Sequence, residues 1–146
     1  MWLSRFLLVL IAFALSFPAK AQQPAGKVPR IGYLSTSSGA GDARGVEALV
    51  QGLRQLGYAE GKNINIEYRF AEGNSERLPE LAKELVGLKV DVIVAPSTPA
   101  VQAAKQATTT VPIIFPGVAD PVASGFVASL ARPGGNITGL INYTPE

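Results

Sequence analysis

The chain has 146 residues, with 13 Lys and Arg against 11 Asp and Glu, and it contains neither Cys nor His. The missing cysteines exclude disulfides and Cys-ligated metals, and the missing histidines remove the commonest general base and transition-metal ligand. The net charge of +2 is small and forms no cationic run, which argues against a nucleic-acid partner. We therefore expect no catalytic residue, no metal site and no cofactor.

Residues 1–21 have the three parts of a secretory signal peptide. Arg5 precedes an apolar run at residues 6–17, and the sequence AKA at 19–21 places small residues at the two positions that a signal peptidase recognises. A transmembrane anchor is the alternative, but the run is shorter than the ~20 residues of a spanning helix. We expect cleavage before Gln22. Because no Cys follows the signal, we expect no lipid anchor and a periplasmic protein.

Strand-like and helix-like stretches alternate along the rest of the chain. The expected strands are compact apolar or alternating runs, and the expected helices carry apolar residues at helical spacing. Strands are expected at residues 28–35, 63–70, 90–95, 111–115 and 137–141, and helices at 42–57, 75–88, 98–108 and 121–131. This alternation predicts a doubly wound α/β fold, with a parallel five-stranded sheet and helices on both faces.

The second predicted strand differs from the others. Ile64, Ile66 and Tyr68 alternate with polar residues, a pattern typical of a half-exposed strand near the edge of a sheet. We therefore expect the strand order 2-1-3-4-5, which places this strand at the edge. Tyr33 and Tyr68 are interpreted as packing residues.

Open parallel sheets bind ligands beyond the carboxyl ends of their strands, near the switch in strand order. Three loops at this position, after the first, third and fourth strands, are rich in hydroxyls, glycines or backbone amides. The candidate ligand-binding residues in them are Ser35, Thr36, Ser97, Thr98, Gly117 and Asp120. None of the three loops holds a clustered base, nucleophile or acid pair, which favours binding over catalysis.

Two of these loops share a pattern. Thr98-Pro99 and Asp120-Pro121 each place a capping residue before a proline at the start of a predicted helix. One interpretation is that both are helix caps and nothing more. The other is that two helix N-termini offer amides and a positive dipole end to a polar head group. Asp120 has two carboxylate oxygens and can therefore serve as a cap and a ligand contact together.

A competing motif lies after the first strand. Gly39, Gly41 and Gly45, with Glu67 or Glu72 further on, resemble a dinucleotide-binding fingerprint. The glycine spacing is one residue longer than the standard form, and several residues separate the strand from the first glycine. We interpret these glycines as a flexible loop and keep a dinucleotide-dependent enzyme as a remote alternative.

Several segments carry a resemblance to a known family. "GYLSTSSG", "GLRQLGYAEGKNINIEYRFAEG" and above all residues 111–139, with "DPVASG" and "PGGNITG", resemble ABC transporter substrate-binding proteins that include tryptophan- and tyrosine-binding members. The resemblance implies a type I periplasmic-binding fold, in which two α/β lobes joined by a hinge close on a solute. In that family a membrane permease driven by an ATPase receives the solute. Many relatives have Ser or Thr where this chain has Ala119, so one hydroxyl contact is expected to be missing.

The resemblance also predicts the organisation and partners of the protein. Residues 22–146 correspond to the N-terminal lobe, so we expect a truncated chain that lacks the second lobe. The expected ligand is a small polar or aromatic amino-acid-like solute, the expected partner is an ABC permease in the inner membrane, and the full-length protein is expected to be a monomer. A ligand-sensing input domain of a signalling receptor is the alternative function.

Overall fold

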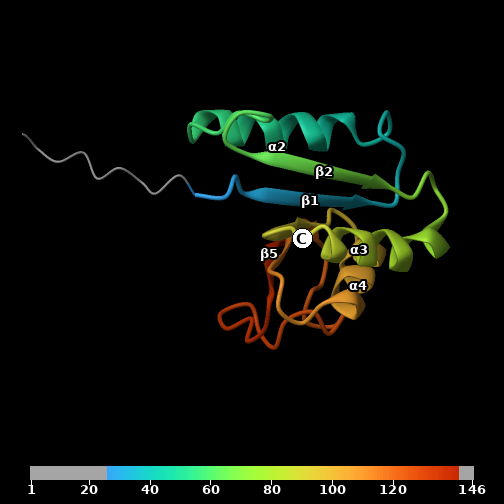
Figure 1. Cartoon of the computed structure of the whole chain (residues 1–146). Helices are drawn as coiled ribbons and strands as arrows, with labels where there is room; N and C mark the ends of the chain where they lie inside the picture. Colours follow the sequence, from blue (N-terminus) through green and yellow to red (C-terminus); the bar gives the residue numbers. More distant parts are fainter. Residues whose placement is uncertain (1–25, 142–146) are drawn as a thin grey trace, which may run out of the picture.

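The computed structural model describes residues 26–141, so the predicted signal peptide lies outside the described residues. These residues form a five-stranded sheet with the order β2-β1-β3-β4-β5, in which all neighbouring strands are parallel (Figure 1). The strands are β1 (Arg30–Ser35), β2 (Asn65–Phe70), β3 (Val92–Val94), β4 (Ile113–Val118) and β5 (Ile137–Ile141). The predicted strand order and the position of β2 at the edge are confirmed.

Helices lie on both faces of this sheet, as predicted. They are α2 (Ala43–Gln55), a short 3-10 turn (Ser75–Arg77) that leads into α3 (Leu78–Gly87), and α4 (Thr98–Ala107). In Figure 1, α2 runs along β1 and β2 on one face, while α3 and α4 lie on the other. Along the sheet, the chain moves in one direction from β1 to β2 and in the other from β2 to β3 and β4. Because crossovers between parallel strands are right-handed, this reversal places α2 on one face and α3 and α4 on the other.

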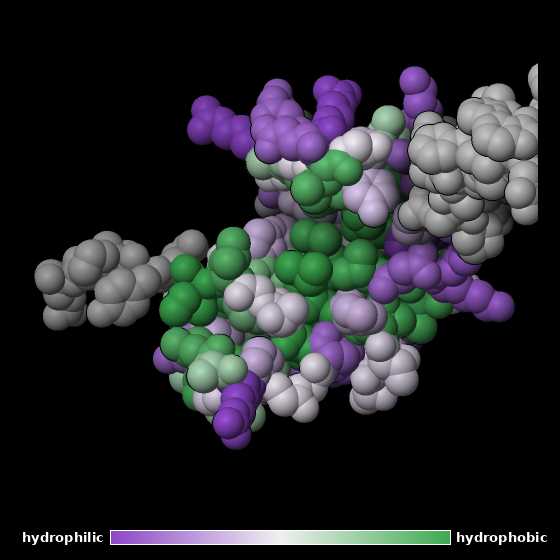
Figure 2. Space-filling view, turned by 90° about the vertical axis from the view of Figure 1, so that its left-hand side faces the viewer, coloured by the Kyte–Doolittle hydropathy of each residue, from purple (hydrophilic) through white to green (hydrophobic). Residues whose placement is uncertain are grey.

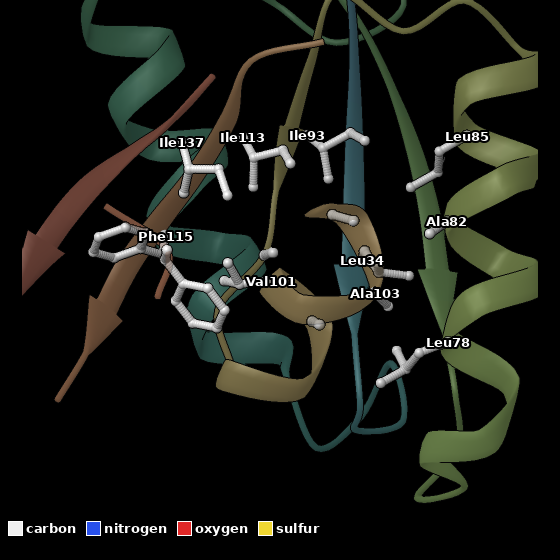
Figure 3. Packing of buried hydrophobic residues seen from close by; sticks show 14 of the residues in the cluster. Leu34, Leu78, Ala82, Leu85, Ile93, Val101, Ala103, Ile113, Phe115 and Ile137 are labelled. Carbon is white, nitrogen blue, oxygen red and sulfur yellow. The ribbon is translucent and has the colours of Figure 1, made fainter. Parts of the chain in front are cut away.

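The sheet face that α3 and α4 cover holds the larger hydrophobic core. Alternate residues of the central strands point to this side, as the period of two in a strand requires. Figure 3 shows the packing between the sheet and the two helices. The fully buried members with the largest side chains include Leu34, Leu78, Leu85, Ile93, Val101, Ile113 and Phe115.

The helix predicted at residues 121–131 does not form, and this prediction was wrong. The segment makes one turn, closed by hydrogen bonds from the Phe126 N–H to the Pro121 carbonyl (2.9 Å) and from the Gly125 N–H to the Val122 carbonyl (2.9 Å). Gly125 has φ +69°, a left-handed conformation that ends helical turns. Phe126 and Val127 are then buried in the core beside α4.

Strand β4 is longer than predicted, and it contains Pro116 and Gly117. Only Ile113 and Ile114 pair with β3, so the missing amide of Pro116 interrupts no bond in that ladder. On its other side, the register between β4 and β5 shifts between Phe115 and Val118. Gly117 therefore lies in an irregular strand end, whereas the sequence placed it in a loop.

Candidate functional site

The carboxyl ends of the parallel strands meet along one side of the sheet, where the arrowheads of β1 and β2 point in Figure 1. Because β3 lies between β1 and β4, the segments after these three strands are neighbours in space. We call this region the carboxyl edge. It has the position at which open α/β sheets bind ligands, beside the switch in strand order between β1 and β3.

Two predicted residues, Thr36 and Ser97, come into contact at the carboxyl edge. They lie 61 positions apart in the sequence, and the Thr36 hydroxyl donates to Ser97 Oγ across 3.5 Å. Both side chains are half-buried rather than sealed, so a ligand can reach their hydroxyls. This pair joins the end of β1 to the start of α4.

Ser97 is the N-cap of α4, a role that the sequence assigned to Thr98. Its backbone is extended (φ −132°, ψ 152°) and Ser97 Oγ accepts from the Ala100 N–H at 3.4 Å. The Val101 N–H donates to the Ser97 carbonyl (2.9 Å), and Pro99 has no N–H. In the first turn of α4, the N–H of the exposed Thr98 therefore remains without a hydrogen-bond acceptor among the described residues.

Ser35 takes a different position from the other hydroxyl residues. It is 1% exposed, and its Oγ accepts from the Ser37 N–H at 3.1 Å. Its buried side chain therefore stabilises the loop after β1. Of Ser35 and Thr36, Thr36 is the one whose hydroxyl a ligand can reach.

Asp120 caps a turn rather than a helix. Its Oδ1 accepts from the Ala123 N–H at 2.8 Å, and its carbonyl accepts from the Ser124 N–H at 3.1 Å. The side chain is exposed, and no hydrogen bond to Oδ2 occurs within the described residues. Of the two helix N-termini that the sequence predicted after the third and fourth strands, the structure thus provides one, that of α4.

A fourth segment, after β2, also belongs to the carboxyl edge, and sequence reasoning missed it. The Gly73 N–H donates to the Thr36 carbonyl (2.8 Å) and the Glu72 N–H to the Ser37 carbonyl (3.3 Å). Glu72 has φ 54° and Gly73 φ 80°, so a tight turn bonds directly to the loop that carries Thr36. The sequence signal for this turn was the Gly-Asn pair at residues 73–74. The turn places Glu72 at the carboxyl edge.

The glycines of the possible dinucleotide motif have packing roles. A Cβ built on Gly39 would lie 3.4 Å from the Phe70 ring, and one built on Gly45 would lie 3.0 Å from the Tyr33 hydroxyl. Neither glycine has a positive φ. Both therefore serve the approach of the loop and α2 to aromatic residues of β1 and β2.

The tyrosines nearest to these glycines stay protonated at physiological pH. Burial, followed by the hydrogen bond to Asp42 (2.8 Å), raises the pKa of Tyr33 above its ordinary value. Burial and the nearby Glu60 carboxylate raise the pKa of Tyr68 to about 12. Neither phenol is poised as a base, and Tyr33, at 2% exposed, has the packing role predicted for it.

Residues 26–141 contain neither a metal-binding cluster nor a membrane-spanning helix. No three or more His, Cys, Asp or Glu side chains gather where a metal ion would be held. In the same residues, no helix combines the length and the apolar character needed to span a bilayer.

Comparison with curated proteins and solved structures identifies similar chains. A tyrosine-binding protein of Clostridioides difficile (strain R20291) is 40% identical over 97 residues, which cover 66% of this chain and 28% of the relative. A ligand-free, open substrate-binding protein with adhesive properties from Clostridium difficile superposes with a TM-score of 0.75 at 32% identity, covering 80% of this chain and 40% of the other.

Two further structures agree with these. An ABC domain from Streptococcus pneumoniae in complex with L-Trp has a TM-score of 0.73 and 30% identity, with coverage of 79% of this chain and 39% of that one. A conserved domain protein from Vibrio cholerae has a TM-score of 0.76 and 36% identity, with coverage of 82% and 40%. The chain thus spans well under half the length of these relatives.

The sequence profile described as ABC transporter substrate binding protein matches residues 32–145, which include β2 to β5 and all but the first two residues of β1. Two of these relatives are described as a tyrosine-binding protein and a substrate-binding protein. On this match, the chain belongs to the ABC transporter substrate-binding protein family.

Proposed function

We propose that this chain forms the N-terminal lobe of an extracytoplasmic protein that delivers a small amino-acid-like solute to an ABC importer. Family membership supports the general role. The names of the relatives support an aromatic amino acid as the solute, since one is a tyrosine-binding protein and another was solved with L-Trp. An inner-membrane permease is the proposed partner and the periplasm the proposed location.

The observation that carries this proposal is the Thr36–Ser97 hydroxyl pair beside the N-terminus of α4. A solute carboxylate placed there would accept from the Thr36 hydroxyl, which would turn from Ser97 Oγ to the solute, and from the Thr98 N–H, near the positive end of the α4 dipole. The carboxylates of Asp120 and Glu72, on either side of the pair, would accept from the solute ammonium group. The site would therefore recognise the two charges of a zwitterion.

The carboxyl edge forms only one wall of such a site. Small-molecule sites bury most of the surface of their ligand. In proteins that close around a solute by hinge bending, the second domain provides the opposing wall. We propose that the additional length present in the relatives provides this wall in the whole protein and contacts the aromatic ring.

Isothermal titration calorimetry of the full-length natural protein with L-tyrosine and L-tryptophan tests the proposal. Loss of one hydrogen bond costs about 1 kcal/mol, and more when the acceptor is charged, so Thr36→Val is expected to weaken binding about tenfold. Thr109→Val is the matched control, because Thr109 is an exposed residue between α4 and β4 at the opposite edge of the sheet. Equal affinity of the wild type and Thr36→Val would contradict the site.

Asp120 can be tested separately from its capping role. Asp120→Asn keeps an oxygen that can accept from the Ala123 N–H, but it removes the negative charge. We expect weaker solute binding with a nearly unchanged midpoint of thermal unfolding. Unchanged binding would show that Asp120 only caps its turn.

A further inference from the structure

Helix α2 is less covered by the rest of the protein than its sequence requires. Each of α3 and α4 has four buried residues, whereas α2 has none although it is the longest helix described. Its apolar stripe, Val46, Leu49, Val50 and Leu53, packs against the cluster on β1 and β2 but remains only half-buried. An amphipathic helix of this length normally buries its apolar stripe, so this layer has room for another partner.

An open groove of about 600 Å³ runs along the side of α2 that faces β2. Its α2 wall includes Ala43, Val46 and Val50, and its other wall is formed by Tyr68 and Phe70 of β2. The rings of Tyr68 and Phe70 are stacked, with centroids 6.1 Å apart and planes inclined by 8°. This groove lies on the face of α2, whereas the Thr36–Ser97 pair lies at the carboxyl edge, so the two are separate features.

The groove also borders the free edge of the sheet. Strand β2 pairs only with β1, which leaves its outer backbone groups without a strand partner. Natural proteins protect such edges by covering them or by placing charges there. Arg69 covers part of the edge, since its guanidinium donates to the Tyr68 carbonyl at 2.8 Å.

Two charges of opposite sign line the α2 wall. Glu47 and Arg54 are seven residues apart, which is two helical turns or about 10.5 Å along one side of the helix. Gln51 lies between them and donates weakly to Glu47 Oε1 at 3.5 Å. None of the ion pairs formed among residues 26–141 includes Glu47 or Arg54.

We propose that this groove is an isologous interface at which a second copy of the chain docks through α2. When two α2 helices run antiparallel about a two-fold axis beside Val50 and Gln51, Glu47 of each copy lies opposite Arg54 of the other. The charge pattern is therefore complementary to itself, as a two-fold interface requires. The same contact buries Val46 and Val50 and covers the stacked rings beside the free edge of β2.

A second copy accounts for these features better than a small ligand. The groove is open along the helix, whereas sites for small molecules enclose most of the ligand. An elongated wall with opposite charges two turns apart matches another helix of equal spacing. The family resemblance alone suggested a monomer, and the exposed α2 surface is the reason for proposing a dimer instead.

Sedimentation equilibrium of the full chain from about 1 to 100 µM, a range in which modest interfaces dissociate, tests this interface. We expect a dimer whose Kd rises about tenfold or more in Arg54→Glu, because both symmetric pairs become repulsive. The double variant Glu47→Arg/Arg54→Glu exchanges the charges and is expected to restore the wild-type Kd. Arg44→Glu is the control, because it makes the same change of charge on α2 at an exposed position outside the groove.

Far-UV circular dichroism of each variant shows whether the fold is kept, and charge reversal at exposed positions should not alter it. A monomer at all concentrations would overturn the proposal, as would a dimer that Arg54→Glu leaves unchanged. Failure of the double variant to restore the dimer would also overturn it, because it would show that Glu47 and Arg54 do not face each other. A monomer that binds an apolar dye competitively with a small aromatic compound would assign the groove to a ligand instead.

Discussion

The two faces of the sheet differ in how completely they are packed. On the α3 and α4 side, strand residues and helix residues interdigitate into one large core (Figure 3). On the α2 side, the helix rests on β1 and β2, and Ile114 of β4 and Leu140 of β5 are 39% and 70% exposed. Figure 2, which views the molecule from the left-hand side of Figure 1, shows exposed hydrophobic surface beneath the polar side chains at the top. The comparison indicates that the α3 and α4 face contributes more to stability, while the α2 face leaves apolar side chains exposed.

The largest expected effect separates the two faces directly. Leu85 of α3 is fully buried over Gly32, so Leu85→Ala removes side-chain atoms from a closed core and should lower the free energy of unfolding by about 2–5 kcal/mol. Leu53 of α2 is only half-buried, and Leu53→Ala should cost about 1 kcal/mol because less area leaves the protein interior. Urea unfolding of the full chain measures both. Equal losses would mean that the two faces contribute equally.

A glycine on the well-packed face gives the next effect. A Cβ built on Gly139 of β5 would overlap the Phe115 carbonyl oxygen and lie 2.6 Å from the Phe115 ring, so Gly139→Ala requires β4 and β5 to separate. We expect a loss of about 1–3 kcal/mol, the usual cost of overpacking. Gly135→Ala is the matched control, because nothing lies within 4 Å of its Cβ position and its φ is not positive. Similar thermal midpoints for both variants would indicate that β5 packs loosely.

Much of this architecture was predictable because periodicity and connectivity constrain it strongly. The spacing of apolar residues predicted α2, α3 and α4, and the alternation in β2 predicted its place at the edge. The same periodicity failed at residues 121–131, where Val122, Phe126 and Leu130 mimic a helical stripe. Gly125 ends the turn there, and the burial of Phe126 and Val127 beside α4 outweighs local helix propensity.

The candidate site was predictable in position but not in detail. Topology alone brings the loops after β1 and β3 together, and Thr36 and Ser97 do meet. Ser97 and Thr98 both suit an N-cap, and the extended backbone at Ser97 decides between them. The α2 groove had no sequence signal, because its width depends on how α2 lies across β1 and β2. Ligand contact by the six candidate residues stays a prediction.

Tyr33 tests how firmly α2 is held on its face. Its hydroxyl donates to Asp42 Oδ2 at the start of α2, so Tyr33→Phe should lower the free energy of unfolding by about 1 kcal/mol at pH 7. Burial raises the pKa of Tyr33, so the folded state keeps the proton at pH values where the unfolded phenol ionises. The advantage over Phe is therefore present below pH ~10 and declines as the pH rises further. An advantage that grows above pH 10 would contradict the assignment.

The smallest effect concerns the amino ends of the strands, which belong to neither face. The Arg30 N–H and the Lys27 ammonium, at 2.8 and 3.1 Å, hold the pKa of Asp91 below its ordinary value. A lowered folded-state pKa stabilises the protein above the unfolded pKa, and this contribution disappears as the pH falls through the folded value. Because the Asp91 side chain is 46% exposed, Asp91→Asn should cost less than about 0.5 kcal/mol at pH 7, and nothing near pH 2. Urea unfolding at both pH values measures the difference. A larger loss at pH 7 would mean that charges at this rim, as well as the α3 and α4 face, hold the sheet together.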